Sequence, residues 1–243
     1  MSKPTRRGYV ESDEKEFKLD AVDKLKLAGM DIIYLINKGY NIKGASTFVG
    51  NHFLLSARQR MALIRIISPY QALHKRIKKE RKNSFTGISV NIDGFNTIIT
   101  LEVAISGSIL LRGMDGTIRD MAGLRGTYKL IDITDKAIML LGEALDRLQV
   151  AEVNIYLDAP VSNSGNLKAR LYELLQLFSF KLHILCVNQV DKILETLDNV
   201  VTSDSIILDK CIGWVNLNST IIDRCILGAK ILNLDLLNEI ERD

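Results

Sequence analysis

The sequence has few cysteines and no long hydrophobic run. Its 243 residues include three cysteines, Cys186, Cys211 and Cys225, which lie far apart and show no Cys-x-x-Cys spacing. Disulfide bonds and a thiolate zinc site are therefore both disfavoured. No apolar run reaches the roughly 18 residues that span a bilayer, and the first residues, MSKPTRRGYVESDEKEF, lack the apolar core of a signal peptide. We expect a cytoplasmic protein that does not associate with membranes.

The sequence also lacks several common catalytic motifs. Its histidines, His52, His74 and His183, have neither metal-ligand spacing nor the spacing of a catalytic triad. No Ser-His-Asp or Cys-His set is recognisable, and a Walker-type GxxxxGK loop is absent. These absences disfavour hydrolases that use an activated serine or cysteine, and they disfavour P-loop nucleotide hydrolases.

What the sequence does have is an ordinary globular composition with an uneven distribution of positive charge. Hydrophobic residues make up 47% of the chain and charged residues 25%, which provides enough apolar material for a sizeable core. The net charge is only +3, but basic residues are concentrated in one segment: Arg58, Arg60, Arg65, Lys75, Arg76, Lys78, Lys79, Arg81 and Lys82. Such a local patch is more informative than the net charge, and it favours a nucleic-acid partner.

The pattern divides the chain into residues 1–83 and residues 84–243. Apolar residues near helical spacing between Asp13 and Arg81 predict a small all-α domain, and Ser56 is placed to cap the helix ARQRMALIRII. Two helices joined by a short turn resemble a helix-turn-helix element, in which Arg58 and Arg60 would contact phosphates. A helical bundle with a solvated basic side fits the same pattern. The charged run KRIKKERKNS marks the predicted boundary.

Strands alternate with helices beyond this boundary. The predicted strands cover residues 88–92, 153–157, 182–187, 200–202 and 214–217. The predicted helices cover residues 98–105, 131–148, 167–178 and 206–212, with a further short helix through Ile193. This alternation predicts an α/β fold with a parallel sheet and helices on both faces. Ligands bind such sheets outside the carboxyl ends of the strands.

Three predicted strands end in aspartate. The stretches VNID, NIYLD and VVTSD place Asp93, Asp158 and Asp204 at one edge of the predicted sheet. A single aspartate of this kind is more often a helix N-cap. Three together repel one another and need a cation, and carboxylate oxygens suit Mg²⁺ or Mn²⁺ better than zinc. The chemistry that we expect from such a site is metal-dependent hydrolysis of a phosphodiester.

The same residues carry a resemblance to a known superfamily. The order strand-Asp93-Gly-Phe-Asn, strand-Asp158 and Thr202-Ser203-Asp204-Ser205 resembles the PIN-like nucleases, with Phe95 where some members have tyrosine. With the helical first part and the motif LDAPVSNSG, the whole chain resembles an archaeal family of uncharacterised proteins with a helical domain before a PIN-like domain. The resemblance implies a metal-dependent ribonuclease or structure-specific nuclease in which Asp93, Asp158 and Asp204 are the catalytic ligands.

PIN-like enzymes usually have another acid in the first helix or the insert after it. We assign Asp120, in the predicted loop LLRGMDGTIRDMAGLRGTYK, as this further metal ligand, while Glu102, Asp115, Glu143 and Asp146 remain alternatives. The same loop contains Arg112, Arg119 and Arg125, which would grip a phosphate backbone if the loop is not merely solvated.

Further substrate contacts are predicted beside the acids. Asn96 follows Asp93 and would cap a helix or orient a metal-bound water, and Ser203 precedes Asp204. In the motif DAPVSNSGNL, the residues Ser162, Asn163 and Ser164 come just before a helix, where they would cap it or bind an anion. Two hypotheses follow: a nuclease acting on RNA, and a PIN-like RNA-binding or scaffold protein that has lost hydrolysis.

Overall fold

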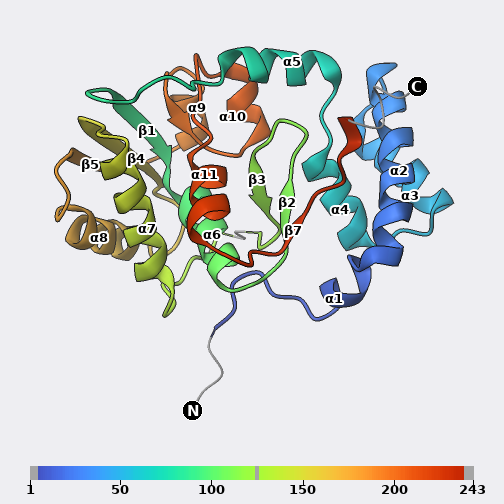
Figure 1. Ribbon diagram of the computed structural model, residues 1–243, viewed down its shortest axis with the longest axis horizontal. Coiled ribbons are helices and arrows are strands. Elements are labelled where there is room, and N and C mark those ends of the chain that lie inside the picture. The colour runs from blue at the N-terminus through green and yellow to red at the C-terminus, as the bar shows by residue number, and fades with distance from the viewer. Residues whose placement is uncertain (1–4, 124–125, 238–243) are drawn as a thin grey trace.

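A computed structural model of the protein describes residues 5–123 and 126–237, and it begins with a group of helices (Figure 1). These are α1 (Asp13–Glu16), α2 (Leu19–Asn37), α3 (Ile42–His52), α4 (Ala57–Ile66) and α5 (Tyr70–Lys79). Local caps fix their starts. The Asn41 side chain accepts hydrogen bonds from the first turn of α3, and Ser56 and Gln59 form a capping box at α4. The predicted cap at Ser56 is therefore confirmed.

The second part is a mixed α/β structure with a four-stranded parallel sheet. Its elements are β1 (Ser89–Asp93), α6 (Gly94–Ile105), α7 (Thr134–Arg147), β4 (Glu152–Asp158), α8 (Ser164–Leu175), β5 (Lys181–Val187), α9 (Val190–Leu194), β6 (Val200–Val201) and α10 (Ser205–Lys210). The strand order is β5-β4-β1-β6, and every neighbouring pair is parallel. The α/β fold class predicted from the alternating pattern is confirmed at this level.

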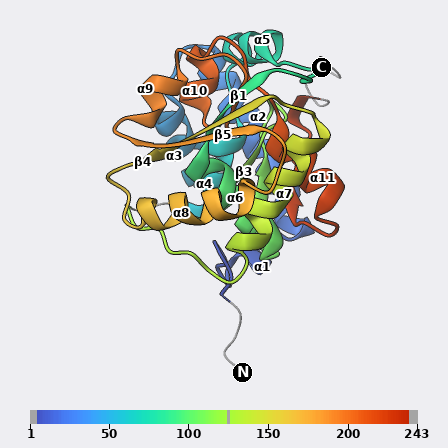
Figure 2. The ribbon, with the colours of Figure 1, turned by 90° about the vertical axis from the view of Figure 1, so that its left-hand side faces the viewer.

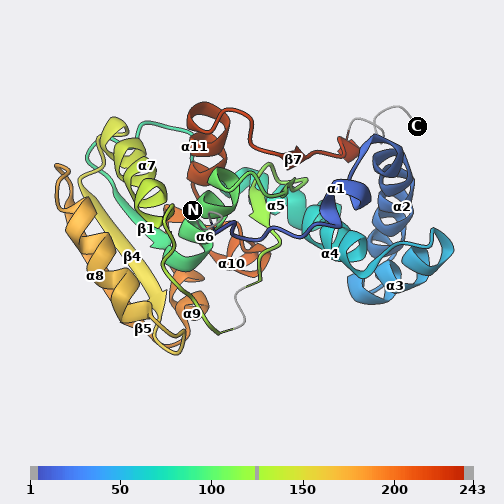
Figure 3. The ribbon, with the colours of Figure 1, turned by 90° about the horizontal axis from the view of Figure 1, so that it is seen from below.

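The two faces of this sheet carry different helices. Along β4, the buried residues Val153, Ile155 and Leu157 pack into a core with α6, α7, α8 and α11 (Leu217–Cys225). The opposite face carries a smaller cluster formed by α9, α10 and the buried indole of Trp214. The views in Figures 2 and 3 show α7 and α8 on one side of the strands and α9 and α10 on the other. Residues with even numbers in β4 therefore face α9.

Two predictions for the second part are wrong. The segment LLRGMDGTIRDMAGLRGTYK is not a loop, because β2 (Leu110–Arg112) and β3 (Ile118–Asp120) form an antiparallel hairpin, which β7 (Ile231–Leu232) extends by pairing with β2 in parallel. A strand over residues 214–217 does not form either. Trp214 makes only isolated bridges, and the buried Leu217, Ile221 and Ile222 have the spacing of a helix, α11.

The helical part does not close its core alone. Apolar residues of α2, α3 and α4 pack with Leu111 and Met121 of the hairpin region, and with Leu232, Leu234 and Leu236. The helices of the predicted 1–83 domain are thus present, but their core includes side chains from well beyond residue 83. Within the described residues, no helix is both long enough and apolar enough to cross a membrane.

Candidate active site at the carboxyl edge of the sheet

The acidic residues lie where the strand order of the sheet reverses. From β1 the chain moves to β4 and then β5, and it returns to the other side of β1 to form β6. In open parallel sheets the binding crevice lies at such a reversal, outside the carboxyl ends of the strands. Asp93 ends β1, and Asp204 follows β6 directly across this reversal. The fold thus brings together two of the three predicted acids by topology alone.

Asp93 is a buried carboxylate that also caps a helix. Its side chain accepts hydrogen bonds from the Asn96 backbone N–H at 3.3 Å and from the Thr202 hydroxyl at 2.9 Å. Burial raises the pKa of Asp93 to about 7, the two hydrogen bonds oppose this shift, and the charges of Asp204 and Asp191 add to it. At neutral pH a large fraction of Asp93 is therefore protonated, which is unusual for an aspartate.

The residue after Asp93 must be small. A Cβ atom at Gly94 would lie 2.6 Å from a methyl group of Leu157 and 2.9 Å from the Tyr156 carbonyl oxygen, both on the neighbouring strand β4. Glycine therefore allows α6 to begin directly against β4. This close approach holds the Asp93 carboxylate at the strand end, pointing toward the face that α9 covers.

Asp204 and Asp158 complete the predicted set. Asp204 caps α10 by accepting hydrogen bonds from the backbone N–H groups of Ile206 at 2.7 Å and Ile207 at 3.4 Å. In the sheet Asp93 is paired with Tyr156, so Asp158 lies two residues farther along β4 on the same face. At about 3.3 Å per residue this places Asp158 roughly 6.6 Å beyond Asp93 along the strand direction.

A fourth acid, Asp191, lies among these three and was not selected from the sequence. It is in the first turn of α9, directly after β5. Partial desolvation raises the pKa of Asp191, and the charges of Asp204, Asp158 and Glu195 raise it further. Asp191 interacts electrostatically with all three predicted acids. The sequence did contain a signal, because Asp191 follows a predicted strand by only a few residues, as the other three acids do.

The donor set suits a hard divalent cation that is held loosely. Among the residues that the structure describes, no group of three His, Cys, Asp or Glu side chains is close enough to ligate one ion together. Mg²⁺ commonly uses only one or two carboxylates and completes its octahedral shell with waters and substrate phosphate oxygens. Pairs of carboxylates at this edge fit that mode of binding better than an all-protein cage.

Asn96 and Ser203 connect the two loops that carry the acids. The Asn96 side-chain oxygen accepts hydrogen bonds from the Ser203 backbone N–H at 2.9 Å and from the Ser203 hydroxyl at 3.0 Å. This bridge fixes the start of α6 to the loop before α10, and so it positions Asp93 relative to Asp204. Ser203 is nearly fully buried. Its hydroxyl therefore serves the bridge. Ser203 also lines a cleft together with Asn96 and Asp204, so its predicted contact with substrate stays a prediction.

Asp120 is not part of this acidic edge. It belongs to β3 of the small sheet, where its oxygens accept hydrogen bonds from the Thr100 hydroxyl at 3.2 Å and the Ala122 backbone N–H at 2.8 Å. Thr100 lies six residues after Gly94 in α6, which is about 9 Å along a helix. The assignment of Asp120 as a metal ligand is therefore wrong, because Asp120 holds the hairpin against the middle of α6. Among the alternatives, Glu102 is also buried and bonded to Tyr128, Thr134 and Arg7.

Three of the arginines predicted to bind phosphate have partners within the protein. Arg112 forms an ion pair with Asp223 at 2.7 Å, and Arg58 forms one with Asp13. Arg60 donates to the Leu55 carbonyl at 3.0 Å. Their contact with phosphate stays a prediction. Their partners in the protein could not be recognised from charge alone, because these partners are distant in sequence or are backbone groups. Arg125 lies outside the described residues.

Arg119 belongs to a cluster of opposite charges that is buried except for Asp209, and that we call the arginine–aspartate cluster: Arg76, Asp115, Arg119 and Asp209. Arg119 also donates to the carbonyl oxygens of Ser203 at 2.8 Å and Arg65 at 3.0 Å. Burial opposes ionisation of Asp115, but the charges and hydrogen bonds of Arg119, with Thr117 and Arg76, lower its pKa to about 2. Through its hydrogen bond to the Ser203 carbonyl oxygen, Arg119 therefore helps to fix the loop that carries Ser203.

The motif after Asp158 is an exposed turn. Asn163 adopts a left-handed backbone conformation with φ of 63°, and its side chain donates to the Tyr128 carbonyl at 2.7 Å. It does not cap α8 with its side chain. The Ser162 backbone N–H donates to the Gly126 carbonyl oxygen at 3.1 Å, and the Ser164 hydroxyl donates to the Ala159 carbonyl oxygen at 3.5 Å. Both serines remain at the surface beside the acidic edge.

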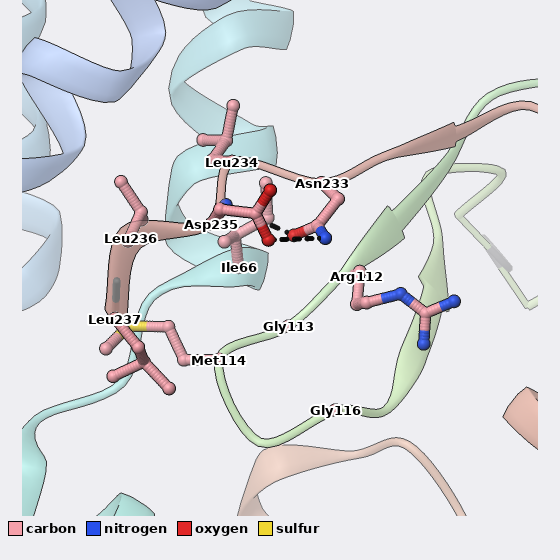
Figure 4. Close-up of a pocket in the computed structure, with 10 residues that line it drawn as sticks. All are labelled: Ile66, Arg112, Gly113, Met114, Gly116, Asn233, Leu234, Asp235, Leu236 and Leu237. Carbon is pink, nitrogen blue, oxygen red and sulfur yellow. Dashed lines mark hydrogen bonds between the residues drawn. The ribbon is translucent and has the colours of Figure 1, made fainter. Parts of the chain in front are cut away.

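Two hollows of the surface differ in their relation to these residues. A pocket of about 210 Å³ lies between the hairpin turn, the end of α4 and residues 233–237, where Asn233 donates to Asp235 (Figure 4). This pocket contains none of the four aspartates at the edge of the parallel sheet, Asp93, Asp158, Asp191 and Asp204. A larger cleft of about 460 Å³ lies between α2, α4 and the acidic edge, and Asn96 and Asp204 line it. We call it the interdomain cleft.

Comparison with known proteins identifies relatives for both parts of the chain. Residues 82–220 match the family described as "Domain of unknown function (DUF5616)", and residues 24–79 match "Protein of unknown function (DUF434)". Over 185 residues the chain is 38% identical to "Uncharacterized protein MJ0935" of the archaeon Methanocaldococcus jannaschii, covering 76% of this chain and 88% of that protein. No solved structure matches the chain. With more than half of its length matched, this chain belongs to the DUF5616 family, and an archaeal uncharacterised protein is one of its relatives.

Proposed function

We propose that the protein is a metal-dependent nuclease that hydrolyses phosphodiester bonds of RNA at the acidic edge of its parallel sheet. The observation that carries this proposal is the gathering of Asp93, Asp158, Asp191 and Asp204 around the reversal of strand order. Desolvation and then the charges of neighbouring acids raise the pKa values of Asp93 and Asp191, and acids gathered in this way at a crevice mark a candidate functional site.

A PIN-like fold for residues 84–243 is part of the same proposal. It is supported by the parallel sheet, by the strand-Asp93-Gly-Phe-Asn start, and by an acid after each strand of the sheet. In this assignment Asp191 takes the place that we first gave to Asp120. The arrangement of α9 just beyond β5 supports that exchange, because it directs Asp191 toward Asp158 and Asp204.

The proposed cofactor is Mg²⁺ or Mn²⁺, held by pairs of these carboxylates. When bound, such an ion supplies charge stabilisation at the phosphoryl group and lowers the pKa of a bound water. The residues of the chain provide the rest. Asn96 and Thr202 orient the loops that carry Asp93 and Asp204. Burial raises the pKa of Asp93, and a cation bound at this edge would favour its ionised form.

The second candidate is an RNA-binding or scaffold protein without hydrolysis. One observation favours it: within the described part of the chain, no three ligating side chains converge on a single point. A protein that had lost catalysis would keep the fold and the cleft, but its acids would no longer lie close enough together to ligate one ion. The two candidates differ in divalent-ion binding and in cleavage, so both quantities need to be measured.

The deciding experiment measures cleavage of labelled single-stranded and structured RNA in Mg²⁺ and in Mn²⁺. We expect Asp93→Asn, Asp191→Asn and Asp204→Asn each to reduce the rate by about hundredfold or more, the scale expected for loss of a group that stabilises transition-state charge. The matched control is Asp132→Asn, an exposed aspartate before α7, which should cleave like the wild type. Absence of cleavage by the wild type, together with absence of Mn²⁺ binding in calorimetry, would overturn the nuclease proposal.

A further inference from the structure

The interdomain cleft joins the helical part to the acidic edge. One wall is apolar and comes from α2, α4 and the segments after them: Ile36, Tyr40, Ile42, Ile64, Ile67 and Pro69. The other end is polar and contains Asn96 and Asp204. At about 460 Å³ the cleft falls within the range of small-molecule binding sites. Both matched families contribute to it, because the apolar wall lies within residues 24–79 and the polar end within residues 82–220.

Tyr40 gives the apolar wall an accessible aromatic ring. It lies in the connection between α2 and α3, and 64% of its surface is exposed. The neighbouring Ile36 and Ile67 are buried, so they form a rigid base beside the ring. An exposed ring next to a fixed apolar surface is the arrangement on which proteins stack nucleobases, because every base has an apolar face.

Arg65 gives the cleft a positive charge that the protein does not neutralise. Its guanidinium donates to the Asp120 carbonyl oxygen at 2.7 Å, and within the described residues no carboxylate lies within ion-pair distance of it. Its neighbours in the cleft differ. Arg76 and Arg119 are compensated by Asp115 and Asp209 in the arginine–aspartate cluster. Among the described residues, Arg65 is therefore the arginine of this cleft that has no carboxylate partner, and a guanidinium is well shaped to bind phosphate.

We propose that the interdomain cleft is a nucleotide subsite that holds the residue next to the scissile phosphodiester. The base stacks on Tyr40 against the isoleucine wall, and its phosphate binds Arg65. Because Asp204 and Asn96 line the same cleft, a nucleotide held there directs the adjoining phosphodiester toward the acids. The position of the subsite along the strand rests on the proposed nuclease function, while the binding of a nucleotide does not. The helical part then serves as half of the substrate site.

The test uses the full chain carrying Asp204→Asn, which removes one repelling carboxylate and prevents metal-dependent turnover. Binding of a labelled single-stranded hexaribonucleotide is measured by fluorescence anisotropy in EDTA. We expect Tyr40→Ala and Arg65→Gln each to weaken binding by about tenfold, since stacking on one aromatic side chain and one charged contact have effects of this order. Tyr40→Phe should retain binding. Arg65→Gln keeps a donor for the Asp120 carbonyl, and thermal melting checks that both variants fold.

Matched controls use the same residue types outside the cleft. Tyr34→Ala removes an exposed tyrosine from α2, and Arg60→Gln removes an arginine from α4. If the cleft variants lose no more affinity than these controls, the subsite proposal is overturned, whether or not the wild type cleaves RNA. If the cleft variants lose affinity selectively while the wild type neither binds Mn²⁺ nor cleaves, the subsite stands and the nuclease proposal fails.

Discussion

Asp93 and Asp115 are both buried aspartates, yet their environments have opposite effects on ionisation. Asp115 lies between Arg76 and Arg119, and its pKa falls to about 2. Asp93 accepts two hydrogen bonds but has no cationic partner among the described residues, and its pKa rises to about 7. Arginines of the protein neutralise Asp115, whereas Asp93 is left for a bound cation to neutralise.

This difference separates structural charges from functional ones. In the arginine–aspartate cluster every charge has an opposite charge beside it, as expected when charges are buried for structure. At the acidic edge the neighbours of each aspartate are other acids. The same contrast holds for the arginines, where Arg58 is paired and Arg65 is not. Unpaired charges mark both the proposed metal site and the proposed nucleotide subsite.

The largest expected effect on stability comes from removing a carboxylate from the arginine–aspartate cluster. Asp115→Asn leaves Arg76 and Arg119 buried with only Asp209 to neutralise them. We expect the free energy of unfolding at pH 7 to fall by about 3–5 kcal/mol, the usual loss when one partner of a buried ion pair is removed. Urea denaturation measures this. Asp209→Asn is the control, because the Asp209 side chain is 42% exposed and should matter less. Equal losses in the two variants would contradict the assignment.

The unpaired side should respond in the opposite direction. Because the pKa of Asp93 is higher in the folded protein than its ordinary value of 3.8, the folded state binds more protons between about pH 4 and pH 7. In EDTA, stability should therefore fall as the pH rises through this window. Asp93→Asn should remove much of that fall and add about 2 kcal/mol at pH 8, out of the roughly 4 kcal/mol that a three-unit shift represents. Thermal melts from pH 4 to pH 8 check this, and a variant less stable than the wild type at pH 8 would indicate that capping dominates.

The effects of Asp191 and Asp120 on metal affinity provide a further comparison between the acidic edge and the small sheet. Asp191 lies among the other acids, whereas Asp120 is bonded to Thr100 and Ala122 in the small sheet. We expect Asp191→Asn to weaken Mn²⁺ binding by about tenfold, which is about 1.4 kcal/mol. Asp120→Asn should leave the affinity unchanged. Titration calorimetry with Mn²⁺ measures both, and the reverse order of effects would restore Asp120 as the further ligand.

The smallest effect is expected in the salt dependence of RNA binding. Loss of one phosphate contact reduces the slope of log affinity against log salt by about 0.7 on a single strand. Arg65→Gln should show this reduction. Arg58→Gln should not, because Asp13 already neutralises Arg58. Filter binding over a salt series, performed with the uncut RNA and the Asp204→Asn protein, distinguishes them. An equal reduction for both arginines would mean that pairing does not decide which arginines reach RNA.

The sequence predicted the strands of the large sheet and the edge at which its acids gather, because alternation and strand ends are local features. The alternative of helix capping is also realised, since Asp93 and Asp204 each cap a helix. Capping and an electrostatic role therefore coexist in the same side chains. Asp191 was missed although it follows β5 by the same rule, because only the acids that end a strand run were considered.

Pairing over long distances could not be predicted. Arg58 and Asp13 are 45 residues apart, and Arg76 and Asp209 are 133 apart. A run of basic residues does not indicate which of its arginines form ion pairs with carboxylates that are distant in sequence. The hairpin β2–β3 was missed for a similar reason, because its turn residues Gly113 and Gly116 resemble those of a solvated loop, and its short strands are held by the distant β7.

The packing of the residues after β7 has a consequence for the order in which the protein can fold during synthesis. Leu232, Leu234 and Leu236 fill the core beneath α2 and α4, and a methyl group of Leu236 would lie 3.1 Å from a Cβ placed on Gly29. The helices leave the ribosome first, but their apolar faces stay uncovered until these leucines have been made. Closure of the helical core must therefore wait until residues 232–236 have been made, and the apolar surface that these leucines cover stays exposed until then.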